Sequence, residues 1–225
     1  MGKLKLVKPE HETLKDLVVA TLRKAILYGD IKPGEQLKQE DIAGQLGISR
    51  MPVREALSQL ENEGLIKNIP YKGCTVKTFT SKDIKEIYQI RKVLESYATG
   101  LATTNMTPED IEKLEELMAK LKNCIESDDI DAYADCDLQF HHMIFEKSTN
   151  KRLNQFIKTI WKSFPMYLAY SIPQRIKRSF EEQSRILDAI REGDSKKASR
   201  LAGKQIETVY EEMKPHFEKT LKSDI

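Results

Sequence analysis

Two short helical patterns that meet at Gly47-Ile48-Ser49 constrain the fold of this chain more than any other feature. The first pattern runs from about Gln39 to Leu46, and the second begins near Ser49. Glycine suits the left-handed residue that closes a helix, and serine is a preferred N-cap. This is the layout of a helix-turn-helix, in which the second helix enters a DNA major groove.

The second helix is predicted to have one apolar and one polar face. The apolar face consists of Val53, Ala56, Leu57 and Leu60. The opposite face carries Met51, Arg54, Glu55 and Ser58, with Arg50 at its N-terminal edge. Arginine can pair with O6 and N7 of guanine through two hydrogen bonds, so we expect Arg50 and Arg54 to contact DNA bases. The alternative is that both are solvated surface charges or partners of Glu55.

A β-type pattern follows this helix and completes a winged helix-turn-helix over residues 1–79. Residues 65–69 and 74–78 are predicted to be two strands joined by a turn that contains Lys72 and Gly73. Lys72 at the tip is expected to reach a phosphate, and Gly73 allows close backbone approach. The alternative for Lys72 is an ordinary polar loop residue. A preceding helix is expected from about residue 12 to 28, with an inner face of Leu14, Val18, Leu22 and Ala25.

Composition permits a nucleic-acid partner without requiring one. The 225 residues carry a net charge of +2, and residues 1–80 hold 13 Lys and Arg against 10 Asp and Glu. The three cysteines have no metal-binding spacing, and no apolar run is long enough to span a membrane. Common phosphate-binding and hydrolase motifs are missing. We therefore expect a cytoplasmic protein that is not an enzyme.

The N-terminal part resembles the GntR family of bacterial transcription regulators. The resemblance covers roughly residues 14–77 and lies in residues 31–37, 47–57 and 63–65. The chain departs from the family at Met51, where threonine is usual, and at Glu40, where arginine is common; Lys38 could partly substitute for that arginine. The resemblance implies a double-stranded operator bound by Lys38, Gln39, Ser49, Arg50, Met51, Pro52, Arg54, Ser58, Lys72 and Gly73.

Everything after residue 80 has a helical pattern. We predict an all-α bundle of about six helices over residues 80–225, which makes the whole chain mainly α. The expected helices span residues 82–104, 108–126, 129–148, 150–171, 173–192 and 195–219.

Polar side chains interrupt the apolar faces of these helices. Four of the expected helices carry polar residues on the face that is expected to turn inward: Arg91 on 82–104, Asp137 and His141 on 129–148, Gln183 on 173–192 and Gln205 on 195–219. A buried polar group without a partner costs roughly 1–3 kcal/mol, and an unpaired charge costs more. We therefore expect these five side chains to line one polar cavity.

The C-terminal part resembles the FCD effector domain of the FadR subfamily of GntR regulators. The resemblance covers most of residues 82–210 and includes the Asp137 and His141 pair. Many members hold a divalent metal with these two residues and two further histidines, whose positions here are Gln183 and Gln205. An amide is a far weaker ligand than imidazole for zinc or nickel. Either Asp137 and His141 still hold a metal, or they form a hydrogen-bonded pair in a metal-free pocket.

Arg91 is the candidate for binding a carboxylate of an effector through two hydrogen bonds. The alternative is a structural salt bridge to Asp137, Glu95 or another acid of the bundle. We expect a ligand-responsive regulator, most simply a repressor, that binds a two-fold operator as a homodimer. Two other classes compete with this function: a hydrolase or lyase that uses the cavity, and a DNA-binding adaptor whose bundle binds another protein.

Overall fold

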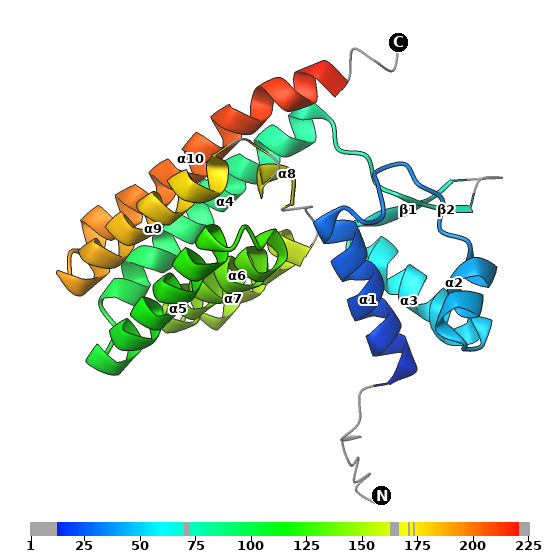
Figure 1. Cartoon of the computed structure of the whole chain (residues 1–225), viewed down its shortest axis with the longest axis horizontal. Helices are drawn as coiled ribbons and strands as arrows, with labels where there is room; N and C mark the ends of the chain where they lie inside the picture. Colours follow the sequence, from blue (N-terminus) through cyan, green and yellow to red (C-terminus); the bar gives the residue numbers. More distant parts are fainter. Residues whose placement is uncertain (1–12, 70–72, 163–166, 171, 173, 221–225) are drawn as a thin grey trace, which may run out of the picture. The chain divides into compact units, whose positions relative to one another are not determined.

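The computed structural model describes residues 13–69, 73–162, 167–170, 172 and 174–220, with the backbone alone described for 167–168 and 216–220. The chain divides into two compact units, with the boundary between Thr78 and Phe79. Helices dominate both units, and the strands form one small hairpin (Figure 1). The winged helix-turn-helix and the all-helical second unit that the sequence predicts are confirmed.

The first unit consists of three helices followed by a hairpin. The elements are α1 (Leu14–Tyr28), α2 (Gln39–Leu46), α3 (Arg50–Asn62), β1 (Ile66–Ile69) and β2 (Gly73–Val76). Thr13 and Asp16 begin α1 with reciprocal hydrogen bonds between side chains and backbone. Gly47 ends α2 with φ of 66°, as the sequence predicts.

The apolar faces of all five elements meet in one core. It contains Val18, Val19, Leu22, Ile26, Leu37, Ala43, Val53, Ala56, Leu57, Leu60, Leu65, Ile66 and Val76. The four α3 residues expected to face inward are therefore buried. The expected inner face of α1 is partly wrong, because Leu14 is 56% exposed and Val19 and Ile26 are buried instead. Leu14 is exposed because it is the first residue of the helix, and the buried residues of α1 are Val18, Val19, Leu22 and Ile26.

The wing is a two-stranded antiparallel hairpin in which Ile66 pairs with Val76 and Ile69 with Gly73. The segment before α2 pairs with the other edge of β2. The Leu37 N–H donates to the Cys74 carbonyl at 2.8 Å, and the Val76 N–H donates to the Glu35 carbonyl at 2.9 Å. This pairing fixes the hairpin against the helical part of the unit. Lys72 lies outside the described residues.

The second unit is a bundle of helices (Figure 1). Its elements are α4 (Ser81–Thr103), α5 (Pro108–Glu126), α6 (Ile130–Lys147), α7 (Lys151–Lys162), α8 (Tyr167–Tyr170), α9 (Arg175–Arg191) and α10 (Ser195–Thr220). Thr80 with Asp83, and Thr107 with Asp110, begin α4 and α5 in the same manner as α1. The expected helix 150–171 corresponds to α7 and α8, and residues 163–166 between them lie outside the described part of the chain.

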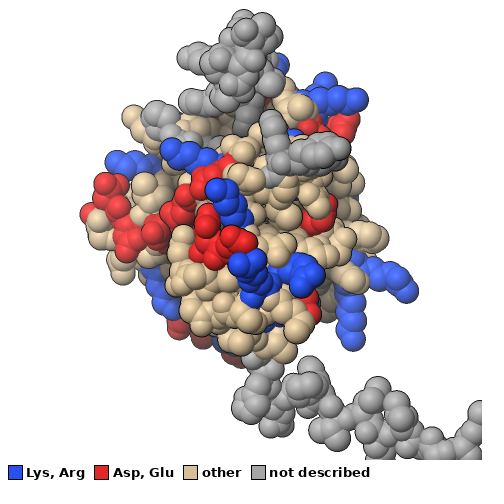
Figure 2. Space-filling view, turned by 90° about the vertical axis from the view of Figure 1, so that its right-hand side faces the viewer, with Lys and Arg blue, Asp and Glu red and all other residues tan. Residues whose placement is uncertain are grey.

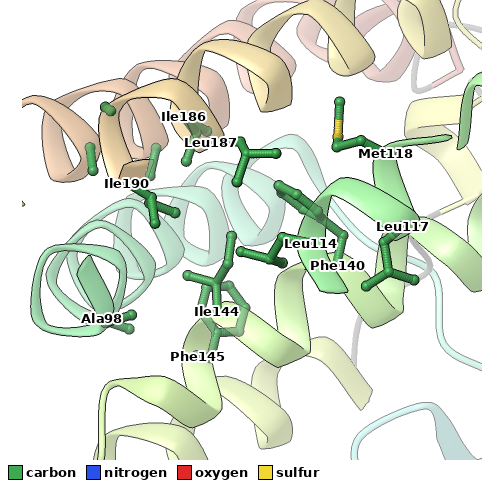
Figure 3. Packing of buried hydrophobic residues seen from close by; sticks show 14 of the residues in the cluster. Ala98, Leu114, Leu117, Met118, Phe140, Ile144, Phe145, Ile186, Leu187 and Ile190 are labelled. Atoms are coloured by element: carbon green, nitrogen blue, oxygen red, sulfur yellow. The ribbon is translucent and has the colours of Figure 1, made fainter. Parts of the chain in front are cut away.

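The bundle core lies between α4, α5, α6 and α9 (Figure 3). Ala98, Leu114, Phe140, Ile144 and Ile190 are among the side chains that interlock there. Ile130, which the sequence places on the inner face of α6, is 48% exposed because it is the first residue of its helix.

Small residues let α4 and α10 run close together. A Cβ atom added at Gly100 would lie 3.2 Å from the Ser199 Cβ, and one added at Gly203 would lie 3.4 Å from the Ser96 Cβ. Larger side chains at either glycine would push the helices apart. No helix among the described residues combines the length and apolar character needed to span a membrane.

Candidate functional sites

The polar face of α3 is open to solvent. Arg50, Met51, Arg54, Glu55 and Ser58 are exposed, and the Met51 side chain is 61% exposed. Ser49 and Pro52 occupy the helix start, where Ser49 has extended backbone angles and makes no side-chain capping hydrogen bond. The residues predicted to meet DNA on this helix therefore form one accessible surface at its first turns.

Arg50 is paired with an acid on the preceding helix. Its Nη1 atom lies 2.7 Å from Oε1 of Glu40, in the first turn of α2, and both side chains are about two-thirds exposed. The alternative in which Glu55 is the partner of Arg50 is wrong, because the turn at Gly47 brings the start of α2 beside the start of α3. The surface thus presents an ion pair at Glu40 and Arg50. In the GntR family, which the sequence resembles, arginine is common at the position of Glu40, so that two cations would stand there.

A second ion pair holds α3 against α1. Arg23 donates to both carboxylate oxygens of Glu63, with Nη2 to Oε1 and Nη2 to Oε2 distances of 2.7 Å, and Gln59 donates to the same carboxylate at 3.0 Å. The two charged side chains are about one-fifth exposed. This contact fixes the C-terminal end of α3 to α1. The helix is therefore held in place while its first turns stay exposed.

Charges of both signs are interspersed on the molecular surface that Figure 2 displays. No continuous patch of a single sign is visible on that face. Lys38 and Gly73 are exposed and Gln39 is half-buried, so these predicted contacts are accessible to different degrees. On the face that Figure 2 displays, a DNA contact would have to come from particular side chains and not from a broad positive field.

The five polar residues predicted to share a cavity converge inside the bundle. Arg91, Asp137, Gln183 and Gln205 are at most 6% exposed, and the His141 side chain is 14% exposed. A cavity of about 40 Å³, here called the inner cavity, is lined by Arg91, Glu95, Asp137, His141, Trp161, Ala169, Tyr170, Arg175, Ser179, Gln205, Ile206 and Val209. Gln183 touches two of these residues from α9.

Arg91 is held by an acid and two aromatic rings. Its Nε atom donates to Oε1 of Glu95 at 2.7 Å, and its guanidinium lies 4.8 Å and 5.0 Å from the ring centroids of Tyr88 and Trp161. Trp161 donates to the same Glu95 oxygen at 2.8 Å. Burial lowers the pKa of Arg91, but Glu95 outweighs it and keeps that pKa above its ordinary value. The salt-bridge alternative is thus present, with Glu95 as the acid.

Asp137 lies at the centre of a second polar cluster. Tyr170 donates to its Oδ2 atom at 2.9 Å, and the Gln183 amide nitrogen donates to its Oδ1 atom. The same amide nitrogen lies 3.2 Å from Nε2 of His141. Asp137 and His141 are themselves 3.8 Å apart, which is beyond hydrogen-bonding distance. The expected direct pair is therefore wrong in detail, because the Gln183 amide lies between the two groups.

Arg175, a residue that was not predicted from the sequence, is 2% exposed and lines the inner cavity. It pairs with Glu182 of the same helix and with Glu212 of α10, the latter at 3.1 Å. The spacing of Arg175, Ser179 and Gln183 at intervals of four residues places all three on one helix face, and this signal could have identified it. Ser179 accepts from Gln205 at 3.4 Å, which brings the fifth predicted residue to the same wall.

A larger cavity of about 230 Å³, here called the outer cavity, shares Tyr170 and Arg175 with the inner one. Its walls include Asp128 and Gln174, which have positive φ values of 54° and 59°. Such backbone conformations are uncommon outside glycine and concentrate at functional sites. The two cavities together provide space for a small molecule beside the buried polar cluster.

The residues present do not fit a zinc or nickel ion. Among the described residues, no group of three or more His, Cys, Asp and Glu side chains is placed to hold a metal. Both Asp137 oxygens are engaged by protein donors, and the Gln183 amide directs its nitrogen, which cannot ligate, toward Asp137 and His141.

Comparison with known proteins matches each unit to a family model. Residues 14–76 match the gntR family of bacterial regulatory proteins, and residues 86–208 match the FCD domain. The chain is 30% identical over 191 residues to the HTH-type transcriptional regulator McbR of Escherichia coli, which covers 83% of this chain and 86% of McbR. The chain belongs to the GntR family.

Two further comparisons support this assignment of the GntR protein. It is 32% identical over 178 residues to the gluconate operon transcriptional repressor of Bacillus subtilis, covering 76% of this chain and 70% of that protein. The solved structure of Escherichia coli McbR/YncC has a TM-score of 0.82 at 27% identity and covers 92% of this chain and 100% of that one. These relatives are transcription regulators, and the protein is a regulator with an FCD domain and not an enzyme.

Proposed function

We propose that this GntR protein is a repressor that binds a two-fold operator as a homodimer and responds to a small carboxylate in the inner and outer cavities. The observation that carries the proposal is the pair of guanidinium groups, Arg91 and Arg175, buried at a cavity inside the FCD domain. Burying a charge costs free energy unless the charge is well paired, and here the partners of both arginines are acids that a ligand carboxylate could replace.

The two arginines also connect three helices of the bundle. Arg91 lies on α4, whereas Arg175 lies on α9 and contacts Glu212 on α10. A ligand carboxylate that bound one of these guanidinium groups would displace the acidic side chain now paired with it. The displaced side chain would alter the packing between these helices. Helix α4 follows the wing after only four residues, 77–80, so a movement of α4 is transmitted along the chain toward the DNA-binding unit.

An exposed apolar stripe on α4 supports the dimer. Ile90, Val93 and Tyr97 are 51%, 66% and 56% exposed and lie on one side of the helix. Exposed apolar groups at such spacing are typical of helix packing between subunits. The stripe lies on the same helix as Arg91 and Glu95, which gives an effector a direct route to the dimer geometry.

Val93→Asp is expected to convert the dimer to a monomer, because a buried carboxylate in an apolar interface would be unpaired. Sedimentation velocity would measure the mass, and operator affinity would fall with it. Phe156→Asp is the matched control, since Phe156 is 63% exposed on α7 and lies outside the stripe. A Val93→Asp protein that remains dimeric would remove α4 from the interface.

Glu40→Gln is expected to strengthen DNA binding and make it more sensitive to salt. The substitution frees Arg50 from its acidic partner, so that it can bind a phosphate. One added phosphate contact makes the slope of log K against log salt steeper by about 1. Fluorescence anisotropy at several salt concentrations would measure the slope. Asp30→Asn, which makes the same charge change after α1, should leave the slope unaltered, and an unaltered slope in Glu40→Gln would show that Arg50 does not approach the backbone.

A ligand screen tests the effector proposal. Small carboxylates would be screened by thermal shift, and each stabilising compound would be added to the protein–operator complex. The expected result is that a stabilising carboxylate also changes operator affinity, and that Arg175→Met abolishes both effects. A compound that stabilises the protein with no effect on DNA binding would contradict the coupling between the cavities and the operator.

A further inference from the structure

We infer that the amide of Gln183 takes the place of a metal ion in this FCD domain, and that the cavity works without zinc or nickel. The inference deepens the proposed function by stating how the effector is held. The tests of this inference measure only the bound metal and the melting temperature. A negative result for the metal-free site is therefore distinguishable from a negative result for DNA binding or effector sensing.

The position of the amide nitrogen carries the inference. It donates to Asp137 Oδ1 and lies 3.2 Å from His141 Nε2, so one uncharged group bridges the carboxylate and the imidazole. The Asp137 carboxylate can only accept here, and the His141 imidazole accepts through Nε2 in the tautomer that carries its proton on Nδ1. These are the two lone pairs that a divalent cation would otherwise occupy.

The opposite orientation of the amide is unfavourable. It would place the Gln183 carbonyl oxygen against the Asp137 carboxylate, and two acceptors would then face each other in a buried site. In the observed orientation the Gln183 Oε1 atom is fully buried and has no hydrogen-bond partner among the described residues. This unsatisfied acceptor is a cost of the observed orientation, and the contact between two acceptors that it avoids is the reason why the NH₂ group lies between Asp137 and His141.

The remaining contacts hold the bridge in place without a cation. Tyr170 saturates the second Asp137 oxygen, and the His141 ring lies against Phe140, Phe145 and Trp161 with centroid distances of 5.4–6.0 Å. Gln183 itself is 0% exposed. Asp137 and His141 thus have partners within the protein and do not need a metal ion. The effector is then recognised directly by side chains such as Arg91 and Arg175, and it does not chelate a metal.

Gln183→Glu provides a sharp test because it keeps the shape and replaces the donor by a carboxylate. Without metal, this carboxylate faces Asp137, and we expect the melting temperature to fall by several degrees. With zinc or nickel, the new carboxylate joins Asp137 and His141 as a third ligand. We then expect one bound ion per chain and a rise of about 5 °C or more. Gln139→Glu makes the same change at an exposed position on α6 and should show neither effect.

The wild-type protein is tested in parallel by calorimetric titration with zinc and with nickel, and by melting in the presence of a chelator. The expected result is no shift with either ion or with the chelator. One tightly bound ion per wild-type chain, lost in Asp137→Asn, would overturn the inference. A Gln183→Glu protein with unchanged stability and no metal binding would also overturn it, because the amide would then not be the bridge. The wild-type titration decides the question even where Gln183→Glu does not fold.

Discussion

Glu95→Ala is expected to destabilise the helical unit by about 3–5 kcal/mol, the loss typical of a buried ion pair deprived of one partner. Arg91 would keep its charge at 6% exposure with no carboxylate at 2.7 Å, and Trp161 would lose the acceptor of its indole N–H. Trp161 is the single tryptophan of the chain, so its fluorescence follows the unfolding of this unit in a denaturant titration.

Two controls separate the buried pair from a general effect of removing charge. Glu207 pairs with Lys92 at 3.2 Å on the exposed side of α4 and α10, and Glu207→Ala should scarcely move the transition. Replacing both members of the buried pair, as in Arg91→Met with Glu95→Leu, should recover most of the stability, because no uncompensated charge remains. A small loss for Glu95→Ala alone would show that Arg91 finds another partner, and that the ion pair does not define the cavity.

Arg54→Ala is expected to weaken operator binding by roughly 5- to 150-fold, corresponding to about 1–3 kcal/mol, and to relax the sequence preference at one base pair in each half-site. Arg54 is exposed on the polar face of α3, one turn after Arg50. Unlike Arg50 with Glu40, it has no ion pair among those found in the described residues. Its guanidinium is therefore the better candidate for two hydrogen bonds to a guanine.

The measurement is a binding titration against the operator and a set of single base-pair variants. Wild-type protein should discriminate at one position that Arg54→Ala no longer reads, whereas both proteins should discriminate alike elsewhere. Arg152→Ala removes an exposed arginine from α7 and should change neither affinity nor preference. Equal weakening on all sequences would assign Arg54 to a phosphate instead of a base.

The spacing of apolar residues predicted the helices well, because a helix that packs on a core needs apolar side chains along one face. Val53, Ala56, Leu57 and Leu60 recur at intervals that only a helix places on one face, and all four are buried. The same argument located Arg91 and Asp137, since a polar residue within an apolar face must point inward. Errors occurred at Leu14 and Ile130, the first residues of their helices, where the periodic pattern continues but the core does not.

The spacing of residues could not predict which side chains form the ion pairs and hydrogen bonds within each site. Spacing placed Glu95 one turn after Arg91, yet it did not decide between Glu95 and the acids of other helices. The Glu40–Arg50 pair depends on how the turn at Gly47 brings two helix starts together, and the Gln183 bridge depends on the orientation of one amide. The Glu40–Arg50 and Gln183 contacts join residues of separate helices, so they are set by tertiary packing and not by local pattern.

We propose that the exposed face of α3 reads a two-fold operator. Hydroxyl-radical footprinting of the DNA upstream of the protein's own gene, with wild-type protein and with Arg50→Ala/Arg54→Ala, tests it most directly. We expect two symmetric protected half-sites, with centres about 10 base pairs or a multiple of this apart, and we expect both to disappear with the double variant. Protection that is identical for both proteins, or that is confined to a single unsymmetrical site, would contradict it.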